Sequence, residues 1–142
     1  MLRLSLLTVV VFALAPGVIH AGESSGLTVV LSADKAVYRP GEPITFTLKA
    51  VNGTSGPIRL SFATAQRFDL VMRDREGREV WRWSAGRMFA QMIGEETLNP
   101  SGGELFFPAM AEGKFPPGEY TVNGVIPALE GALTASITVR VQ

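Results

Sequence analysis

The chain contains no cysteine, and among its 142 residues it has a single histidine, His20. Without cysteine it can form no disulfide, no thiolate metal site and no cysteine nucleophile. It also lacks an excess of either charge, because 13 basic and 13 acidic side chains give a formal net charge of zero. Nucleic-acid binding favours a basic excess, so the composition gives no support for a nucleic-acid partner.

The first 21 residues have the pattern of a secretory signal. Arg3 precedes the apolar run Leu4–Ala15, and Ala21 is a small residue of the kind that a signal peptidase requires. The apolar run is shorter than the roughly 20 residues that span a bilayer, so we expect no stable membrane span after cleavage. We therefore predict a signal peptide at residues 1–21, a mature domain at residues 22–142, and a secreted or periplasmic location.

The rest of the chain has the pattern of short β-strands joined by turns. Its glycines and prolines are spread along the sequence, which argues against long helices. Apolar and polar side chains alternate in the segments 27–31, 44–50, 58–62, 68–72 and 133–141. Alternation of this kind buries one face of a strand and leaves the other in water. The sequence therefore predicts an all-β fold, an antiparallel β-sandwich of about seven to nine strands.

The apolar faces of these strands predict the core. We expect the following side chains to be buried between two antiparallel sheets: Ile44, Phe46, Leu48, Leu60, Phe62, Leu70, Val122, Ile137 and Val139. Tyr120 follows a Pro-Gly turn, where a tyrosine corner would close a sandwich. An ordinary core tyrosine explains the same position equally well.

A more specific pattern lies between residues 66 and 91. Its central element is Glu79-Val-Trp-Arg-Trp-Ser84, followed by Met88-Phe89 and by Gln91. The flanking segments are Val51-Asn-Gly-Thr54 and Pro117-Gly-Glu-Tyr-Thr-Val-Asn-Gly124. Together these segments resemble the intracellular proteinase inhibitor (BsuPI-type) family over about residues 27–141. The resemblance implies an immunoglobulin-like β-sandwich and an inhibitor of serine proteinases, with subtilisin-like enzymes among the expected targets.

Two functions from different classes follow from these observations. The first is inhibition of a proteinase in the periplasm or outside the cell. The alternative is a non-catalytic immunoglobulin-like interaction module that binds an envelope or surface protein through a sheet edge or a loop. Both functions require a protein partner, and the sequence specifies neither that partner nor an oligomeric state.

Two segments could form an inhibitory loop. A substrate-like inhibitor places an extended, preorganised loop in the proteinase cleft, and here packing must supply the bracing that disulfides often give. The short segment 63–67 offers Arg67, which suits a trypsin-like pocket. The longer segment 84–93 offers Met88 and Phe89, which suit a subtilisin-like pocket or could instead cap the sandwich. Of the two segments, the second is the better candidate for an inhibitory loop, because the family resemblance converges on it.

The other conspicuous side chains have structural explanations. Trp81 and Trp83 share one face of a predicted strand and should cover the core, with at least one indole N–H reaching a partner or solvent. Arg82 faces the other way, where we expect an exposed pair with Asp69 or Asp74 that contributes less than about 1 kcal/mol.

The acidic residues show no catalytic or metal-binding pattern. Asp69, Asp74 and Glu76 cluster around one predicted hairpin, but their spacing does not match a calcium-binding loop. Glu95 and Glu96 are adjacent, and we expect them in a solvated loop and not facing each other across a cleft. A Ser-His-Asp triad is excluded if His20 leaves with the signal peptide. The sequence therefore predicts a protein that is not an enzyme and has no metal site and no cofactor.

Overall fold

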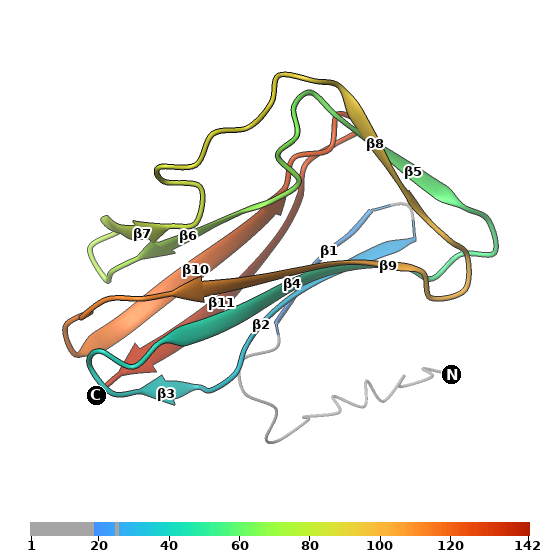
Figure 1. The fold of residues 1–142 in the computed structure, drawn as a ribbon. Helices are drawn as coiled ribbons and strands as arrows, with labels where there is room; N and C mark the ends of the chain where they lie inside the picture. The colour runs from blue at the N-terminus through green and yellow to red at the C-terminus, as the bar shows by residue number, and fades with distance from the viewer. Residues whose placement is uncertain (1–18, 25) are drawn as a thin grey trace, which may run out of the picture.

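The fold is a β-sandwich, described by a computed structural model for residues 19–24 and 26–142 (Figure 1). The described residues contain no helix, and hence no helix long and apolar enough to span a membrane. They form the strands β1 (Ile19–Ser24), β2 (Leu27–Ala33), β3 (Val37–Tyr38), β4 (Ile44–Asn52), β5 (Ile58–Phe62), β6 (Asp69–Arg73), β7 (Glu79–Arg82), β8 (Gly94–Leu98), β9 (Glu104–Ala111), β10 (Gly118–Ile126) and β11 (Leu133–Val141).

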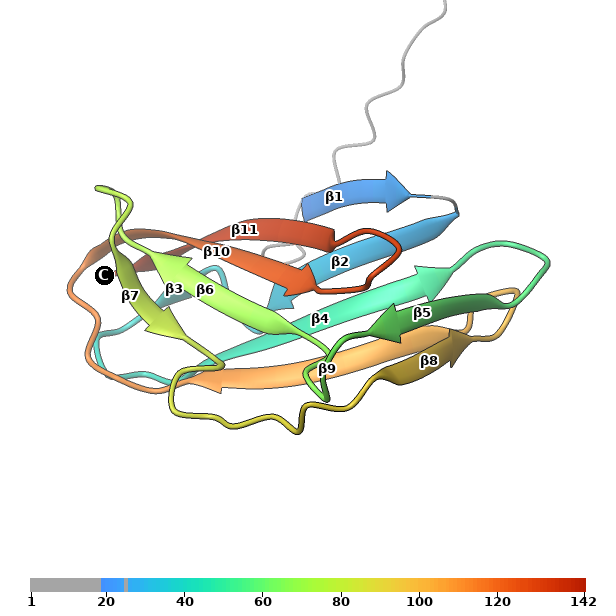
Figure 2. The same cartoon turned by 90° about the horizontal axis from the view of Figure 1, so that it is seen from above.

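Two sheets face each other across the core. The first has the order β1-β2-β4-β9, and the second has the order β3-β11-β10-β6-β7. A third, two-stranded sheet pairs β5 with β8 at one end of the molecule (Figure 2). All pairs are antiparallel except that between β3 and β11, which is parallel.

The alternation seen in the sequence corresponds to burial in the structure. Along β4 every second side chain is buried, and β11 presents the same alternation from the facing sheet. Every side chain predicted to lie in the core is buried, and none is more than 3% exposed: Ile44, Phe46, Leu48, Leu60, Phe62, Leu70, Val122, Ile137 and Val139. Leu60 and Phe62 lie on β5, so they join the core from the two-stranded sheet and not from one of the facing sheets.

The described residues form eleven strands, more than the seven to nine that the sequence predicts. One reason is β9, whose Pro108 interrupts the sequence pattern expected of a strand. Proline is tolerated there because β9 is the edge strand of the first sheet. Another is β1, which begins inside the predicted signal peptide and pairs with β2. Residues 1–18 of that predicted signal lie outside the described residues, and the division at residue 21 stays a prediction.

A tyrosine corner closes the turn before β10. Tyr120 is buried, and its hydroxyl donates a hydrogen bond to the carbonyl oxygen of Pro116 at 2.5 Å. A bond from the tyrosine hydroxyl to backbone a few residues upstream is the geometry that defines this corner in β-sandwiches. Of the two explanations open from the sequence, the structure therefore favours the corner.

Candidate functional site

One side of the sandwich is covered by a loop and not by a strand. The strand β7 forms one edge of the second sheet, and β9 forms one edge of the first. The segment 83–93 runs from β7 to β8 along this side: Figure 2 shows it beside β9, and in Figure 1 it passes above β9. Its first residues form a turn, and the remainder has no regular secondary structure. Residues 83–93 are called the β7–β8 loop below.

A row of aromatic rings supports the β7–β8 loop from beneath. Phe107 of β9 stacks on Phe68 with 4.7 Å between ring centroids, and Phe68 lies 4.0 Å from Trp83. Phe89 continues the row, with its ring centroid 5.9 Å from that of Trp83. The row joins the edge of the first sheet to the loop, so the loop rests on a continuous apolar surface.

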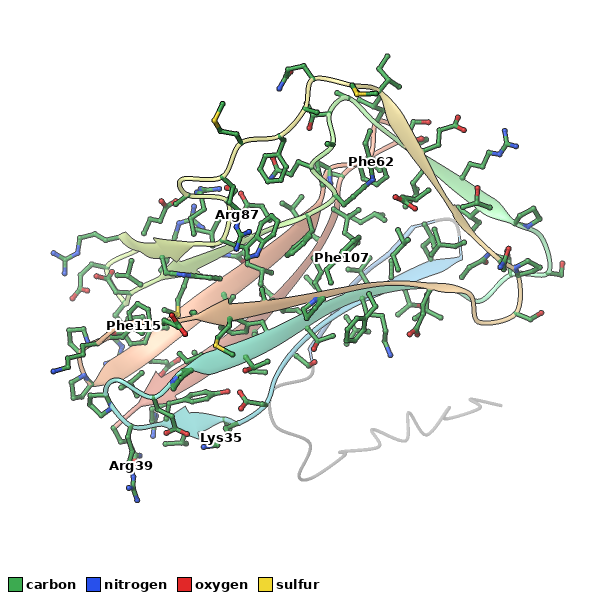
Figure 3. The ribbon with its side chains drawn as sticks, in the orientation of Figure 1. Lys35, Arg39, Phe62, Arg87, Phe107 and Phe115 are labelled. Carbon is green, nitrogen blue, oxygen red and sulfur yellow. The ribbon has the colours of Figure 1, made fainter. Side chains whose placement is uncertain are left out.

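Charged and backbone groups add to this packing around Trp83. The guanidinium of Arg87, which is labelled in Figure 3, lies over the indole ring at 4.3 Å from its centroid. The Nε of Arg87 donates to the carbonyl oxygen of Trp83 at 2.8 Å. Trp81 lies 5.9 Å from the core ring of Phe46. Both tryptophans are half-buried against the core, which confirms their predicted covering role.

Asp69 anchors the start of the β7–β8 loop. It is one of two buried polar residues among those described, together with Asn52. Its Oδ2 accepts from the hydroxyl of Ser84 at 2.6 Å and from Nη1 of Arg82 at 3.0 Å, while its Oδ1 accepts from the backbone N–H of Ser84 at 3.1 Å. Arg82 also forms an ion pair with Glu79. Its hydrogen bonds raise the pKa of the guanidinium, with the bond to Glu79 contributing most and the bond to Asp69 next.

This anchor corrects an expectation from the sequence. Arg82 does pair with Asp69, but the pair is not the exposed contact that was expected, because the Asp69 side chain is only 9% exposed. A carboxylate removed from water in this way depends on the hydrogen bonds that it accepts. The sequence did not predict that Asp69 positions the β7–β8 loop. The alternation of side chains along a β-strand gives no signal that Ser84 reaches the same carboxylate.

Two further contacts shape the β7–β8 loop. The backbone N–H of Arg87 donates to the carbonyl oxygen of Ser84 at 3.0 Å, and Gly86 within this turn has a φ of +74° that favours glycine. Farther along, the carbonyl oxygen of Ala90 accepts from the backbone N–H of Ala65 at 2.9 Å. The two segments proposed from the sequence as inhibitory loops are thus joined by a backbone hydrogen bond.

The side chains predicted as contacts differ sharply in their surroundings. Met88 is 97% exposed, whereas its neighbour Phe89 is half-buried against Trp83. Met92 and Ile93, which the sequence did not single out, are 69% and 80% exposed. The loop therefore presents apolar side chains to solvent from a backbone that is tied to the sandwich.

Arg67 is held by contacts within its own chain. Its Nε donates to Glu96 at 3.0 Å, its Nη1 donates to the carbonyl oxygen of Thr64 at 2.8 Å, and its guanidinium lies 4.6 Å from the ring centroid of Phe62. The side chain is only 22% exposed. Entry of Arg67 into a trypsin-like pocket would have to break these contacts.

The acidic side chains discussed from the sequence are held in separate local contacts. No group of three or more potential metal ligands occurs among the described residues. Asp74 accepts hydrogen bonds from the backbone and the guanidinium of Arg78. Glu95 and Glu96 lie in β8 and not in the expected loop, so their side chains point to opposite faces of that strand.

Comparison with known proteins identifies the family. Residues 31–131 match the model of the BsuPI family, described as intracellular proteinase inhibitor. The chain belongs to this family. The family is described as one of proteinase inhibitors, which implies a proteinase as the kind of partner. The predicted secreted or periplasmic location is wrong by the same finding, because the matched family is described as intracellular.

Solved structures share the fold at low sequence identity. The C-terminal domain of Wzt is 13% identical with a TM-score of 0.56, over 90% of this chain and 82% of that one. Spo0M, a sporulation control protein from Bacillus subtilis, is 18% identical with a TM-score of 0.54, over 84% of this chain. This chain covers half the length of Spo0M. A search of curated protein sequences finds no match.

Proposed function

We propose that this domain inhibits a subtilisin-like serine proteinase by inserting Met88 of the β7–β8 loop into the primary specificity pocket. The observation that supports this most is the contrast between a fully solvated Met88 side chain and the fixed backbone on both sides of it. Unbranched apolar side chains suit a wide apolar pocket, and the 97% exposure of Met88 makes it accessible without rearrangement of the loop.

Preorganisation is the physical reason for preferring this loop. Binding an extended segment costs conformational entropy, and a loop already held in place loses less of it. Asp69 and Ser84 hold the start of the loop, and the bond between Ala65 and Ala90 holds its later part. Because the chain has no cysteine, these contacts supply the bracing that disulfides often give to an inhibitory loop.

The two other candidate residues, Phe89 and Arg67, do not enter the proteinase pocket in this proposal. Phe89 packs on Trp83, so we assign it to supporting the loop and not to filling the proteinase pocket. Arg67 is bound to Glu96 and Thr64 and would favour only a trypsin-like target, which the proposal does not require.

The test is to measure inhibition of a subtilisin-like proteinase and of trypsin by the purified domain. Met88→Ala should weaken the inhibition constant for the subtilisin-like enzyme by roughly 30-fold, because a central apolar anchor contributes about 2 kcal/mol. Arg67→Ala should leave that constant unchanged, since its side chain is turned toward its own chain. Both variants must retain the cooperative unfolding of the unaltered domain. No inhibition by the unaltered domain at stoichiometric concentration would refute the proposal and favour an interaction module.

A further inference from the structure

The methionines of the chain occupy very different environments. Apart from Met1, they are Met72, Met88, Met92 and Met110. Met72 lies in the core and is fully buried, Met110 is 52% exposed on β9, and Met92 and Met88 on the β7–β8 loop are 69% and 97% exposed. The structure thus ranks the four thioethers by their accessibility to a small molecule in solution.

We propose that Met88 is a site of reversible oxidation by peroxides, and that its oxidation switches inhibition off. The consequence for inhibition depends on the proposed function, whereas the site of oxidation does not. In the reaction the thioether sulfur attacks one oxygen of hydrogen peroxide, and the O–O bond breaks. The oxygen is transferred to sulfur, the thioether loses two electrons, and the peroxide is reduced to water.

Two features direct the reaction to Met88. The chain has no cysteine, so no thiol competes within it for the oxidant. The Met88 side chain is almost completely solvated, whereas burial in the core shields the sulfur of Met72. Among the ranked methionines, Met88 should therefore react first, Met92 and Met110 more slowly, and Met72 last.

Oxidation changes the property of Met88 on which inhibition would depend. Sulfoxide formation converts a flexible apolar side chain into a polar one. A polar S=O group placed in an apolar proteinase pocket loses its hydrogen bonds to water without replacement. Because methionine sulfoxide reductases return the sulfoxide to the thioether, the inhibitor would recover its activity once the oxidant is gone.

The test follows oxidation and inhibition in the same samples. The folded domain is treated with hydrogen peroxide, the sulfoxide at each methionine is quantified by peptide mass spectrometry, and the inhibition constant is measured in parallel. We expect Met88 to be oxidised fastest and the inhibition constant to weaken about tenfold or more as Met88 is consumed. Reduction by methionine sulfoxide reductase should restore it.

Matched variants separate Met88 from the other exposed methionines. Met88→Leu replaces the thioether by an apolar side chain of similar size, so peroxide should leave the inhibition constant of this variant at its own untreated value. Met110→Leu, a change outside the β7–β8 loop, should remain as sensitive as the unaltered domain. Loss of inhibition by Met88→Leu under peroxide would overturn the proposal.

Failure of this inference can be told apart from failure of the proposed function. Oxidation of Met110 before Met88 would overturn the assignment of the site, whatever the domain inhibits. Oxidation of Met88 with no change in the inhibition constant would overturn the switch while leaving inhibition intact. If the untreated domain inhibits no serine proteinase, the proposed function and the switch both fail, and the peptide map alone decides whether Met88 is the preferred site.

Discussion

Replacing Asp69 by Asn tests whether this buried carboxylate fixes the β7–β8 loop. Asn keeps the size of the side chain and its Oδ1 acceptor, but it puts an NH₂ group where Oδ2 accepts from Arg82 and Ser84. A hydrogen bond to a charged group contributes about 1.5–3 kcal/mol. Arg82 can turn to water and to Glu79, and the Ser84 hydroxyl can reverse and accept, so part of this loss is recovered. We expect Asp69→Asn to lower the free energy of unfolding by about 2 kcal/mol.

The assay is urea unfolding followed by tryptophan fluorescence, since Trp81 and Trp83 lie next to the affected contacts. The urea midpoint should fall while the slope of free energy against urea stays constant, as expected when only stability changes. The matched control is Glu79→Gln, which removes the exposed partner of the same guanidinium. Because surface pairs contribute little, this control should cost less than about 1 kcal/mol. If the two variants lost the same stability, Asp69 would not be the anchor of the loop.

Three further changes test the core and the titration behaviour. Phe46→Ala should lower the free energy of unfolding by about 3–5 kcal/mol, because the ring is fully buried against both sheets; a loss below about 1 kcal/mol in urea unfolding would contradict that packing. Gly124→Val should lower the free energy of unfolding by about 1–3 kcal/mol in the same assay, because even a Cβ at this position would lie 2.9 Å from a methyl group of Leu48. An unchanged urea midpoint would refute this close approach. Burial and a hydrogen bond to Asp34 raise the pKa of Tyr38 well above its usual value of about 10. Above about pH 10 only the unfolded chain releases this proton, so the free energy of unfolding should fall as the pH rises. Tyr38→Phe should reduce that slope in unfolding curves between pH 9 and about pH 11.5, and an unaltered slope would argue against the shift.

The fold class and the core follow from the sequence alone. Alternation along residues 44–50 and 133–141 specifies which side chains face inward, because successive side chains of a strand point to opposite faces. The pattern around Trp81 and Trp83 also indicates the family, and the family match to residues 31–131 confirms it. Strand β9 was harder to predict, because Pro108 is acceptable only at a sheet edge, and edge position is a property of the whole sheet.

How the candidate loop is held depends on tertiary contacts that the sequence does not reveal. The carboxylate of Asp69 accepts a hydrogen bond from Ser84, and the backbone N–H of Ala65 donates one to Ala90. These partners are far apart in the sequence, and local alternation does not predict contacts between distant residues. The adjacent residues Met88 and Phe89 look equivalent in the sequence, yet one is solvated and the other packs on Trp83. The reason is physical: alternation reports which face of a strand is buried, whereas an irregular loop takes its orientation from the side chains beneath it, and these come from distant segments of the chain.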